Sequence, residues 1–421
     1  MTARPSRFGA PGEALRSPSY RVLLATQLAI GLTQPLLFFS QSWWVNTAVS
    51  ESNRVLFLGL LGASRGIVFL AYVTLGGAIA DRMPRRKVVQ YSSVLTVALI
   101  IAVDALLWLP VLGETESIPL VLLMIGLFAT FGLATAQDVP TRTSMVRDTL
   151  PDAQLGGGIA LFQLLMGGSV MFAAPTAGIL IERLGIPATY VLGGIGPLLV
   201  AILVWWLPRD IGAADPDAAK VSVLANLRGG FGVLREDPVV RWTVILTWVS
   251  TMLGLSILGV LVAAWASEVL GLNAAGWGRL AFFWGLGSLV AATALTIKDV
   301  TRHRGKFFLG WAFIFGLAVL AFSLSRSLPL VYASTAVAGG SYMAFNIAGI
   351  SIVQKTVPNR LLGRVTGLLL LGQGLMQVFA LFVGIVARFA GLEAVYLAAA
   401  IVLISLTTAV AVIQRPLRTL D

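Results

Sequence analysis

The chain has 421 residues, of which 57% are hydrophobic and only 12% charged, whereas about 25% of the residues of a soluble domain carry a charge. Its net charge of +11 comes from cations spread over several short segments, which excludes the single basic cluster that a nucleic-acid groove needs. The sequence has no cysteine and one histidine, His303, so disulfides and thiolate metal sites are excluded and histidine chemistry has little basis.

Apolar residues occur in blocks of about 20, the length at which an α-helix crosses the hydrocarbon core of a membrane. The blocks are continuous, whereas strands of membrane barrels alternate apolar and polar residues. We therefore predict an all-α membrane protein with twelve transmembrane helices, the first of them retained because no signal-peptide cleavage site is visible. The predicted spans cover residues 20–45, 55–80, 88–111, 118–138, 156–181, 187–207, 240–266, 276–297, 306–325, 328–353, 363–387 and 391–414.

One long hydrophilic stretch separates the sixth and seventh predicted spans. The sequence thus predicts an N-terminal half at 1–207, a cytoplasmic linker with a short interfacial helix at 208–239, and a C-terminal half at 240–421. Most Lys and Arg residues fall on one side of the membrane if the N-terminus is cytoplasmic, in agreement with the positive-inside rule. We therefore expect both termini in the cytoplasm and the chain in a plasma membrane of the bacterial (inner-membrane) type.

Two loop regions match at an offset of 207 residues. The segment "SMVRDTLPDAQLGGGIAL" (144–161) shares seven of eighteen residues with "SIVQKTVPNRLLGRVTGL" (351–368). Common turn chemistry before a helix can produce part of this similarity. A parallel repeat of two six-helix halves explains it better, and this architecture places a substrate site between the halves near the bilayer midplane. Twelve spans and a repeat indicate a secondary transporter.

The segment "GAIADRMPRRK" (77–87) resembles the signature loop of the major facilitator superfamily, Gly-x-x-x-Asp-Arg-x-Gly-Arg-Arg-Lys, between its second and third helices. Proline at position 84 replaces the usual glycine. Together with "VPTRTSMVRDTLPDAQLGGGIAL" and "LREDPVVR", this variant is similar to the branch that contains the enterobactin exporter and the macrolide-efflux proteins. The matching residues are Gly77, Asp81, Arg82, Arg85, Arg86 and Lys87.

In that family the matching Asp and Arg belong to a charge cluster that latches the two halves in the outward-facing state. The resemblance implies a latch formed by Gly77, Asp81, Arg82, Arg85 and Arg86, with Asp138 as the acid at the end of the fourth helix and the eleventh helix starting near Gly363. In the alternative interpretation, the cations only fix the topology and Asp81 neutralises one of them.

Few ionisable side chains lie inside the predicted spans, where a charge is costly and therefore indicates function. Arg65 in the second span and Asp104 in the third lie at similar depths, so they can form a structural ion pair. Alternatively, Asp104 is the proton-coupling acid, because only a carboxylate with a raised pKa can take this role where histidine is excluded. The first span carries no acid, unlike that of several drug–proton antiporters of the family.

By family analogy, the first, fourth, seventh and tenth helices and their neighbours line a substrate cavity. Their amides, hydroxyls and aromatic rings suit a bulky amphipathic solute better than a small ion or a phosphate ester, which needs paired cations. We expect about half of them to serve helix packing instead. The candidates are Gln34, Gln41, Thr135, Gln163, Thr247, Thr251, Tyr342, Asn346, Gln373 and Gln377.

The sequence therefore predicts a transporter, not an enzyme, that exports a drug-like or siderophore-like small molecule by proton antiport. No phosphate-binding Gly-x-x-x-x-Gly-Lys segment occurs, which argues against an ATP-driven pump. We expect no cofactor and no metal, and a proton gradient as the driving force. The expected partners are the small-molecule solute and membrane lipid, without nucleic acid. The protein is expected to act as a monomer. Proton-coupled uptake of a nutrient and a non-transporting sensor or scaffold are the alternatives.

Overall fold

The computed structural model describes residues 11–80, 83–108, 117–136, 138–208, 211, 223–297 and 303–420. The described residues form helices and their connections, without a strand. They fold into two compact units. Unit 1 contains Met1–Trp44 and Ala71–Lys220, and unit 2 contains Val45–Leu70 and Val221–Asp421. Unit 2 thus includes the end of the first predicted span and most of the second.

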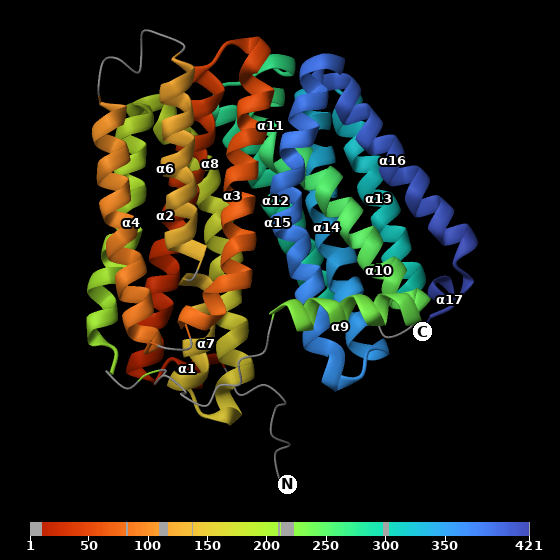
Figure 1. Ribbon diagram of the computed structural model, residues 1–421, viewed down its shortest axis with the longest axis horizontal. Coiled ribbons are helices and arrows are strands. Elements are labelled where there is room, and N and C mark those ends of the chain that lie inside the picture. The colour runs from red at the N-terminus through yellow and green to blue at the C-terminus, as the bar shows by residue number, and fades with distance from the viewer. Residues whose placement is uncertain are drawn as a thin grey trace. The chain divides into compact units, whose positions relative to one another are not determined.

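Unit 1 is built around α2, α4, α6 and α8, of which α4 packs against both α6 and α8 (Figure 1). Helices α2 and α3 belong partly to each unit. The boundary between the units follows Trp44 in α2 and Leu70 in α3. The elements are α1 (Pro11–Ala14), α2 (Pro18–Ala48), α3 (Glu51–Ala80), α4 (Arg85–Leu107), α6 (Ile118–Ala136), α7 (Asp138–Thr149), α8 (Asp152–Leu203) and η1 (Val204–Trp206).

In unit 2, α14 packs against both α12 and α13, and α15 packs against η2 and α9. The short helix α9 lies at one end of this unit and α11 at the other (Figure 1). The elements are α9 (Val223–Glu236), α10 (Pro238–Val249), η2 (Ser250–Val260), α11 (Val262–Ala264), η3 (Trp265–Val269), α12 (Ala274–Ile297), α13 (Arg304–Leu324), α14 (Leu328–Thr356), α15 (Asn359–Ala390), α16 (Leu392–Ile413) and α17 (Arg415–Arg418).

Ten helices of the described part are long and apolar enough to cross a membrane, and Ile118–Gly132 is a shorter apolar helix. Helix α8 counts once among these ten, although it covers two predicted spans. It breaks at Gly185, whose φ of 83° and ψ of 169° are not helical and favour glycine. The chain is therefore an all-α, multi-pass membrane protein, and the number of twelve spans stays a prediction.

The seventh predicted span is not a regular α-helix. Within it, η2 and η3 are π-helical, and backbone bonds run from the N–H of Leu261 to the carbonyl of Ser256 at 3.0 Å and from Leu270 to Trp265 at 3.2 Å. Each bond joins residues five apart instead of four, which widens the helix locally and often marks a functional position. The apolar pattern of 240–266 gives no sign of this change.

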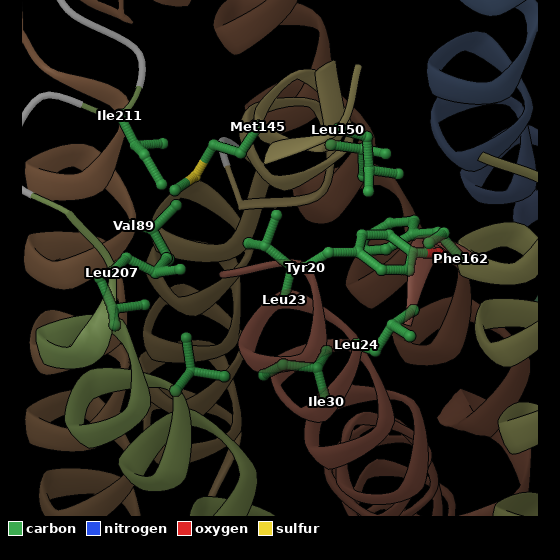
Figure 2. Close-up of a cluster of buried hydrophobic side chains, with 14 residues drawn as sticks. Tyr20, Leu23, Leu24, Ile30, Val89, Met145, Leu150, Phe162, Leu207 and Ile211 are labelled. Atoms are coloured by element: carbon green, nitrogen blue, oxygen red, sulfur yellow. The ribbon is translucent and has the colours of Figure 1, made fainter. Parts of the chain in front are cut away.

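A buried apolar cluster of unit 1 joins the first turns of α2 to α4, α7 and α8 (Figure 2). Tyr20 and Leu23 of α2 lie beside Met145 of α7 and Phe162 of α8, and the Tyr20 hydroxyl donates a hydrogen bond to the carbonyl of Gly158 at 2.7 Å. Burial of this apolar surface fixes α7 against α2. The same packing determines where the polar side chains of α7 lie.

The two repeated segments share one backbone plan. Helix α7 ends at Thr149 and α8 follows Pro151, while α14 ends at Thr356 and α15 follows Pro358. Both prolines are extended, with φ and ψ of −67° and 155° for Pro151 and −57° and 144° for Pro358. The sequence match at offset 207 thus corresponds to the same helix–proline–helix junction in each unit.

Candidate functional site

The predicted latch lies at the start of α4. Gly77 belongs to α3, and Asp81 and Arg82 lie outside the described residues. Arg85 is the first residue of α4, and its Nη1 donates to both carboxylate oxygens of Asp148 at 2.8 and 3.2 Å. Arg86 is buried and its Nη2 donates to the carbonyl of Trp205 at 3.1 Å. The two arginines thus tie α4 to the end of α7 and to η1.

Arg85 and Asp138, both predicted for the latch, pair with other residues in the structure. Asp138 pairs with Arg142, whose Nη2 lies 2.6 Å from its Oδ2. Asp148 lies ten residues after Asp138, which is about 15 Å along a helix. Asp148, at the end of α7, thus contacts the first turn of α4, while the part of Asp138 in a latch stays a prediction.

Arg142 is the main polar residue that the sequence reasoning missed. Its side chain is fully buried, and its Nη1 donates to Oε1 of Gln27 on α2 at 2.9 Å. The pair with Asp138 has the i, i+4 spacing of neighbouring residues on a helix face. This spacing is visible in "DVPTR", but the predicted span ended at residue 138, so Arg142 was not considered as an intramembrane charge.

Asp104 lies in the last turn of α4 and is half-buried. Its Oδ2 accepts a hydrogen bond from Trp108 Nε1 at 3.1 Å, while its Oδ1 is buried without a hydrogen-bond partner in the described part of the chain. Arg65 is half-buried on the portion of α3 that belongs to unit 2. Because the two residues lie in different units, their ion pair stays a prediction.

Four predicted cavity residues come together in unit 2 around the hydroxyl of Tyr342. This oxygen lies 3.2 Å from Thr251 Oγ1, and Gln373 Nε2 donates to it at 3.4 Å. Asn346 Nδ2 donates to the Tyr342 carbonyl at 2.9 Å. We call Thr251, Tyr342, Asn346 and Gln373 the Tyr342 cluster; its members come from η2, α14 and α15.

Aromatic rings surround the Tyr342 cluster. The ring centroids of Trp284, Phe315 and Phe345 lie 5.7, 5.6 and 5.2 Å from that of Tyr342. Thr251 belongs to the π-helical η2, so the widened backbone of the seventh span carries one of the hydroxyls. The arrangement presents amide and hydroxyl groups beside aromatic surface and contains no ionisable acid or base that is charged at neutral pH.

The remaining cavity candidates do not join this cluster. Gln41 is buried and donates to the Tyr190 hydroxyl at 3.1 Å, and the Thr247 hydroxyl donates within its own helix to the Thr243 carbonyl. Gln377 is half-buried on α15. Of the others, Gln34 and Gln163 are exposed and Thr135 lies on α6.

Among the described residues, no group of three or more His, Asp or Glu side chains could hold a metal ion.

Comparison with known proteins identifies the family. The sequence profile of the Major Facilitator Superfamily matches residues 23–381. The chain is 26% identical over 417 residues to the multidrug efflux pump Tap of Mycolicibacterium fortuitum, a match that covers 96% of this chain and 98% of the relative.

Solved transporter structures share the fold. A POT family transporter in complex with 5-aminolevulinic acid matches with a TM-score of 0.72 at 14% identity, over 94% of this chain and 96% of its own. A D-xylose-proton symporter matches with a TM-score of 0.67 at 16% identity, over 91% of this chain and 96% of its own. The chain therefore belongs to the Major Facilitator Superfamily and is a membrane transporter, not an enzyme.

Proposed function

We propose that this transporter exports a hydrophobic or amphipathic small molecule, drug-like or siderophore-like, in exchange for protons. In this mechanism the binding site opens to one side of the membrane at a time, and it carries the solute in one direction and protons in the other. The full-length match to a multidrug efflux pump supports the direction of transport. Export is favoured over uptake because the uptake symporter among the similar structures shares only the fold.

The Tyr342 cluster carries the proposal. Its hydroxyls and amides can orient a solute through hydrogen bonds, while Trp284, Phe315 and Phe345 offer apolar surface beside them. A phosphate ester needs paired cations, which this cluster does not contain. A bulky solute with apolar surface and a few polar groups fits this chemistry best.

The two moving halves are residues 1–207 and 240–421, and the linker 208–239 joins them through α9. The N-terminus, the C-terminus and the linker lie in the cytoplasm of a cell with a bacterial-type plasma membrane, in agreement with the distribution of Lys and Arg. The chain functions as a monomer surrounded by lipid. The latch consists of Gly77, Asp81, Arg82, Arg85, Arg86 and Asp138, and Asp148 joins it through its ion pair with Arg85. Arg65 and Asp104 are the candidates for proton coupling.

The test is export from a host without its own efflux pumps, followed with and without a protonophore. Expression of this chain should lower accumulation of ethidium, an amphipathic fluorescent solute, and a protonophore should abolish the effect. Everted vesicles should accumulate the same solute when their interior is acidified. Accumulation in right-side-out vesicles driven by an inward proton gradient would instead show uptake, and binding without flux would show a sensor.

Tyr342→Phe tests the site itself. It removes only the hydroxyl that contacts Thr251 and Gln373, so we expect the apparent KM for ethidium to rise several-fold while the protein stays folded. Tyr332→Phe is the matched control, because the Tyr332 hydroxyl is buried on the same helix without a hydrogen-bond partner in the described structure. Equal kinetics of both variants and wild type would exclude the Tyr342 cluster from solute binding.

A further inference from the structure

In the proposed orientation, the cytoplasmic end of unit 2 carries four arginines whose charges are not neutralised. Arg228 and Arg235 belong to α9, Arg360 and Arg364 belong to the start of α15, and all four side chains are exposed. Within the described residues, none of the four takes part in an ion pair or a hydrogen bond. Their guanidinium groups are therefore available to an anion from outside the chain.

The acids near these arginines do not pair with them. Between residues 223 and 249, and between 351 and 390, the described residues include two acids, Glu236 and Asp237. Asp237 Oδ1 accepts hydrogen bonds from the backbone N–H groups of Val239 and Val240 at 2.8 and 3.1 Å, and thereby caps α10. Glu236 is exposed and forms no ion pair within the described residues. This surface therefore keeps an excess of positive charge.

Helix α9 presents two of the arginines on a face that points away from the protein. The helix runs crosswise to the long helices of unit 2 (Figure 1). Its Leu234 is buried in an apolar cluster with Val365 and Leu368 of α15, which fixes one side of α9. Arg228 and Arg235 are spaced i and i+7, so they share one face of the helix, and both are exposed.

An exposed aromatic ring lies between these two arginines. Phe231 is three residues after Arg228 and therefore belongs to the same face. Its ring centroid lies 6.2 Å from that of Trp248, a residue of the seventh predicted span, so the ring is on the membrane side of α9. A short helix with cations beside an exposed aromatic ring is typical of helices that lie in the membrane surface.

Arg364 approaches the same helix from α15. A Cβ on Gly229 would lie 2.8 Å from Cδ and 3.1 Å from Cζ of Arg364, so this side chain lies against the backbone of α9 next to Arg228. A Cβ on Gly232 would have no atom within 4 Å, so the backbone there is open. Two arginines beside open backbone, without an acid, suit a phosphate, which a guanidinium binds through two parallel hydrogen bonds.

The repeat indicates that the fold does not need this charge. At the offset of 207 residues, Arg360 and Arg364 correspond to Ala153 and Gly157 of unit 1. The same helix–proline–helix junction thus forms in unit 1 without these cations. The positive-inside rule explains cations on this side of the membrane, but it counts charges and does not determine which faces they occupy.

We propose that the face of α9 formed by Arg228, Phe231 and Arg235, together with Arg364, binds anionic phospholipid headgroups of the cytoplasmic leaflet. The lipid phosphate lies between Arg228 and Arg364, and the Phe231 ring enters the boundary of the acyl chains. A free phosphate would gain nothing from the exposed ring, whereas a lipid surface covers it. The site is separate from the Tyr342 cluster and does not depend on the direction of transport.

Native mass spectrometry of the purified full chain in detergent measures this binding, with phosphatidylglycerol and phosphatidylcholine of the same acyl chains as probes. Wild type should bind phosphatidylglycerol more tightly. Arg228→Gln/Arg364→Gln should weaken that binding about 30-fold, since each cation near an anionic lipid contributes about fivefold. Arg16→Gln/Arg21→Gln is the matched control, because it removes two exposed cations from unit 1 on the same proposed side of the membrane and should leave the affinity unchanged.

Three results would overturn the proposal: equal binding of both lipids by wild type, unchanged affinity in the Arg228→Gln/Arg364→Gln variant, or an equal loss in the control. Competition by inorganic phosphate at the concentration of the lipid would assign the site to soluble phosphates and would also overturn it. The thermal unfolding midpoint in detergent shows whether each variant is folded. If the double variant unfolds, Arg235→Gln on the exposed face replaces it, with an expected loss of about fivefold.

Discussion

Arg85, which belongs to the segment that resembles the signature loop of the family, forms an ion pair with Asp148. Their side chains are 41% and 27% exposed, and an ion pair of this kind contributes roughly 0–1 kcal/mol to stability. Such an energy is too small to hold the fold. It is large enough to change the ratio of two conformations about fivefold, because 1 kcal/mol exceeds the thermal energy nearly twofold. We therefore expect this pair to influence the transport cycle more than the folding of the chain.

The first prediction follows from this argument. Asp148→Arg should lower the initial transport rate in proteoliposomes several-fold and leave the thermal unfolding midpoint in detergent nearly unchanged. The charge-swapped double variant Arg85→Asp/Asp148→Arg should recover most of the rate. Lys87→Ala removes a cation from the same first turn of α4 and serves as the control. If it is as harmful as Arg85→Ala, the cations of this turn act only as a topology signal.

The acids that follow the fourth apolar block illustrate what a sequence can reveal at the residue scale. The motif identified Arg85 correctly as a charged residue at the start of a helix, because proline and a run of cations mark that boundary. It could not choose between two acids, Asp138 and Asp148, which both follow the fourth apolar block. Which acid lies beside Arg85 depends on how far the helical chain continues after the fourth apolar block. The pattern of apolar residues gives no information on this point, because the residues there are polar.

At the scale of elements, the apolar blocks predicted the helices well but not their irregularities. The described residues of the predicted spans are largely helical, since continuous apolar sequence of this length has few other stable forms in a membrane. The π-helical η2 was not predicted, because it depends on how side chains such as Ser256, which donates to the Met376 carbonyl at 3.0 Å, pack against α15. Such tertiary contacts leave no periodic signal.

Helix α9, the short helix predicted within the linker, is helical through its three glycines, Gly229, Gly230 and Gly232. Its surroundings differ among the three. A Cβ on Gly230 would lie 2.9 Å from Leu368 Cδ1 and 3.0 Å from the Arg364 carbonyl, and Gly229 faces the Arg364 side chain. Gly232 has no atom near enough to contact a Cβ. Close packing on α15 therefore favours glycine at position 230, where a backbone carbonyl is the neighbour, while at position 229 the flexible Arg364 side chain can move aside.

Alanine substitutions on α9 should separate these roles. Gly230→Ala should destabilise the chain by about 1–2 kcal/mol, because the added carbon meets a backbone carbonyl that cannot move freely. Gly232→Ala should be neutral or stabilise it by about 0.5–1 kcal/mol, since alanine has the higher helix propensity. Unfolding midpoints in detergent measure both variants. Equal effects would mean that α9 does not pack on α15 in the membrane protein.

At the scale of the whole molecule, the division into units cuts through two helices. Residues 45–70 belong to unit 2, where Arg54 Nη1 lies 3.2 Å from Glu268 Oε1 and Asn46 Nδ2 donates to Ser267 Oγ at 3.1 Å. A Cβ on Gly59 would lie 2.8 Å from the Ala380 carbonyl, so α3 and α15 touch through their backbones. This packing joins the N-terminal part of α3 firmly to the C-terminal part of the chain.

Alternating access requires that such contacts open during each cycle, because residues 45–70 belong by sequence to the proposed N-terminal half. A disulfide across them should therefore stop transport. The chain has no cysteine, so Asn46→Cys/Ser267→Cys introduces a single defined pair. Oxidation should abolish ethidium transport, a reductant should restore it, and neither treatment should affect the two single variants. Unchanged transport by the fully cross-linked protein would show that this contact stays closed throughout the cycle, and that the halves separate along another boundary.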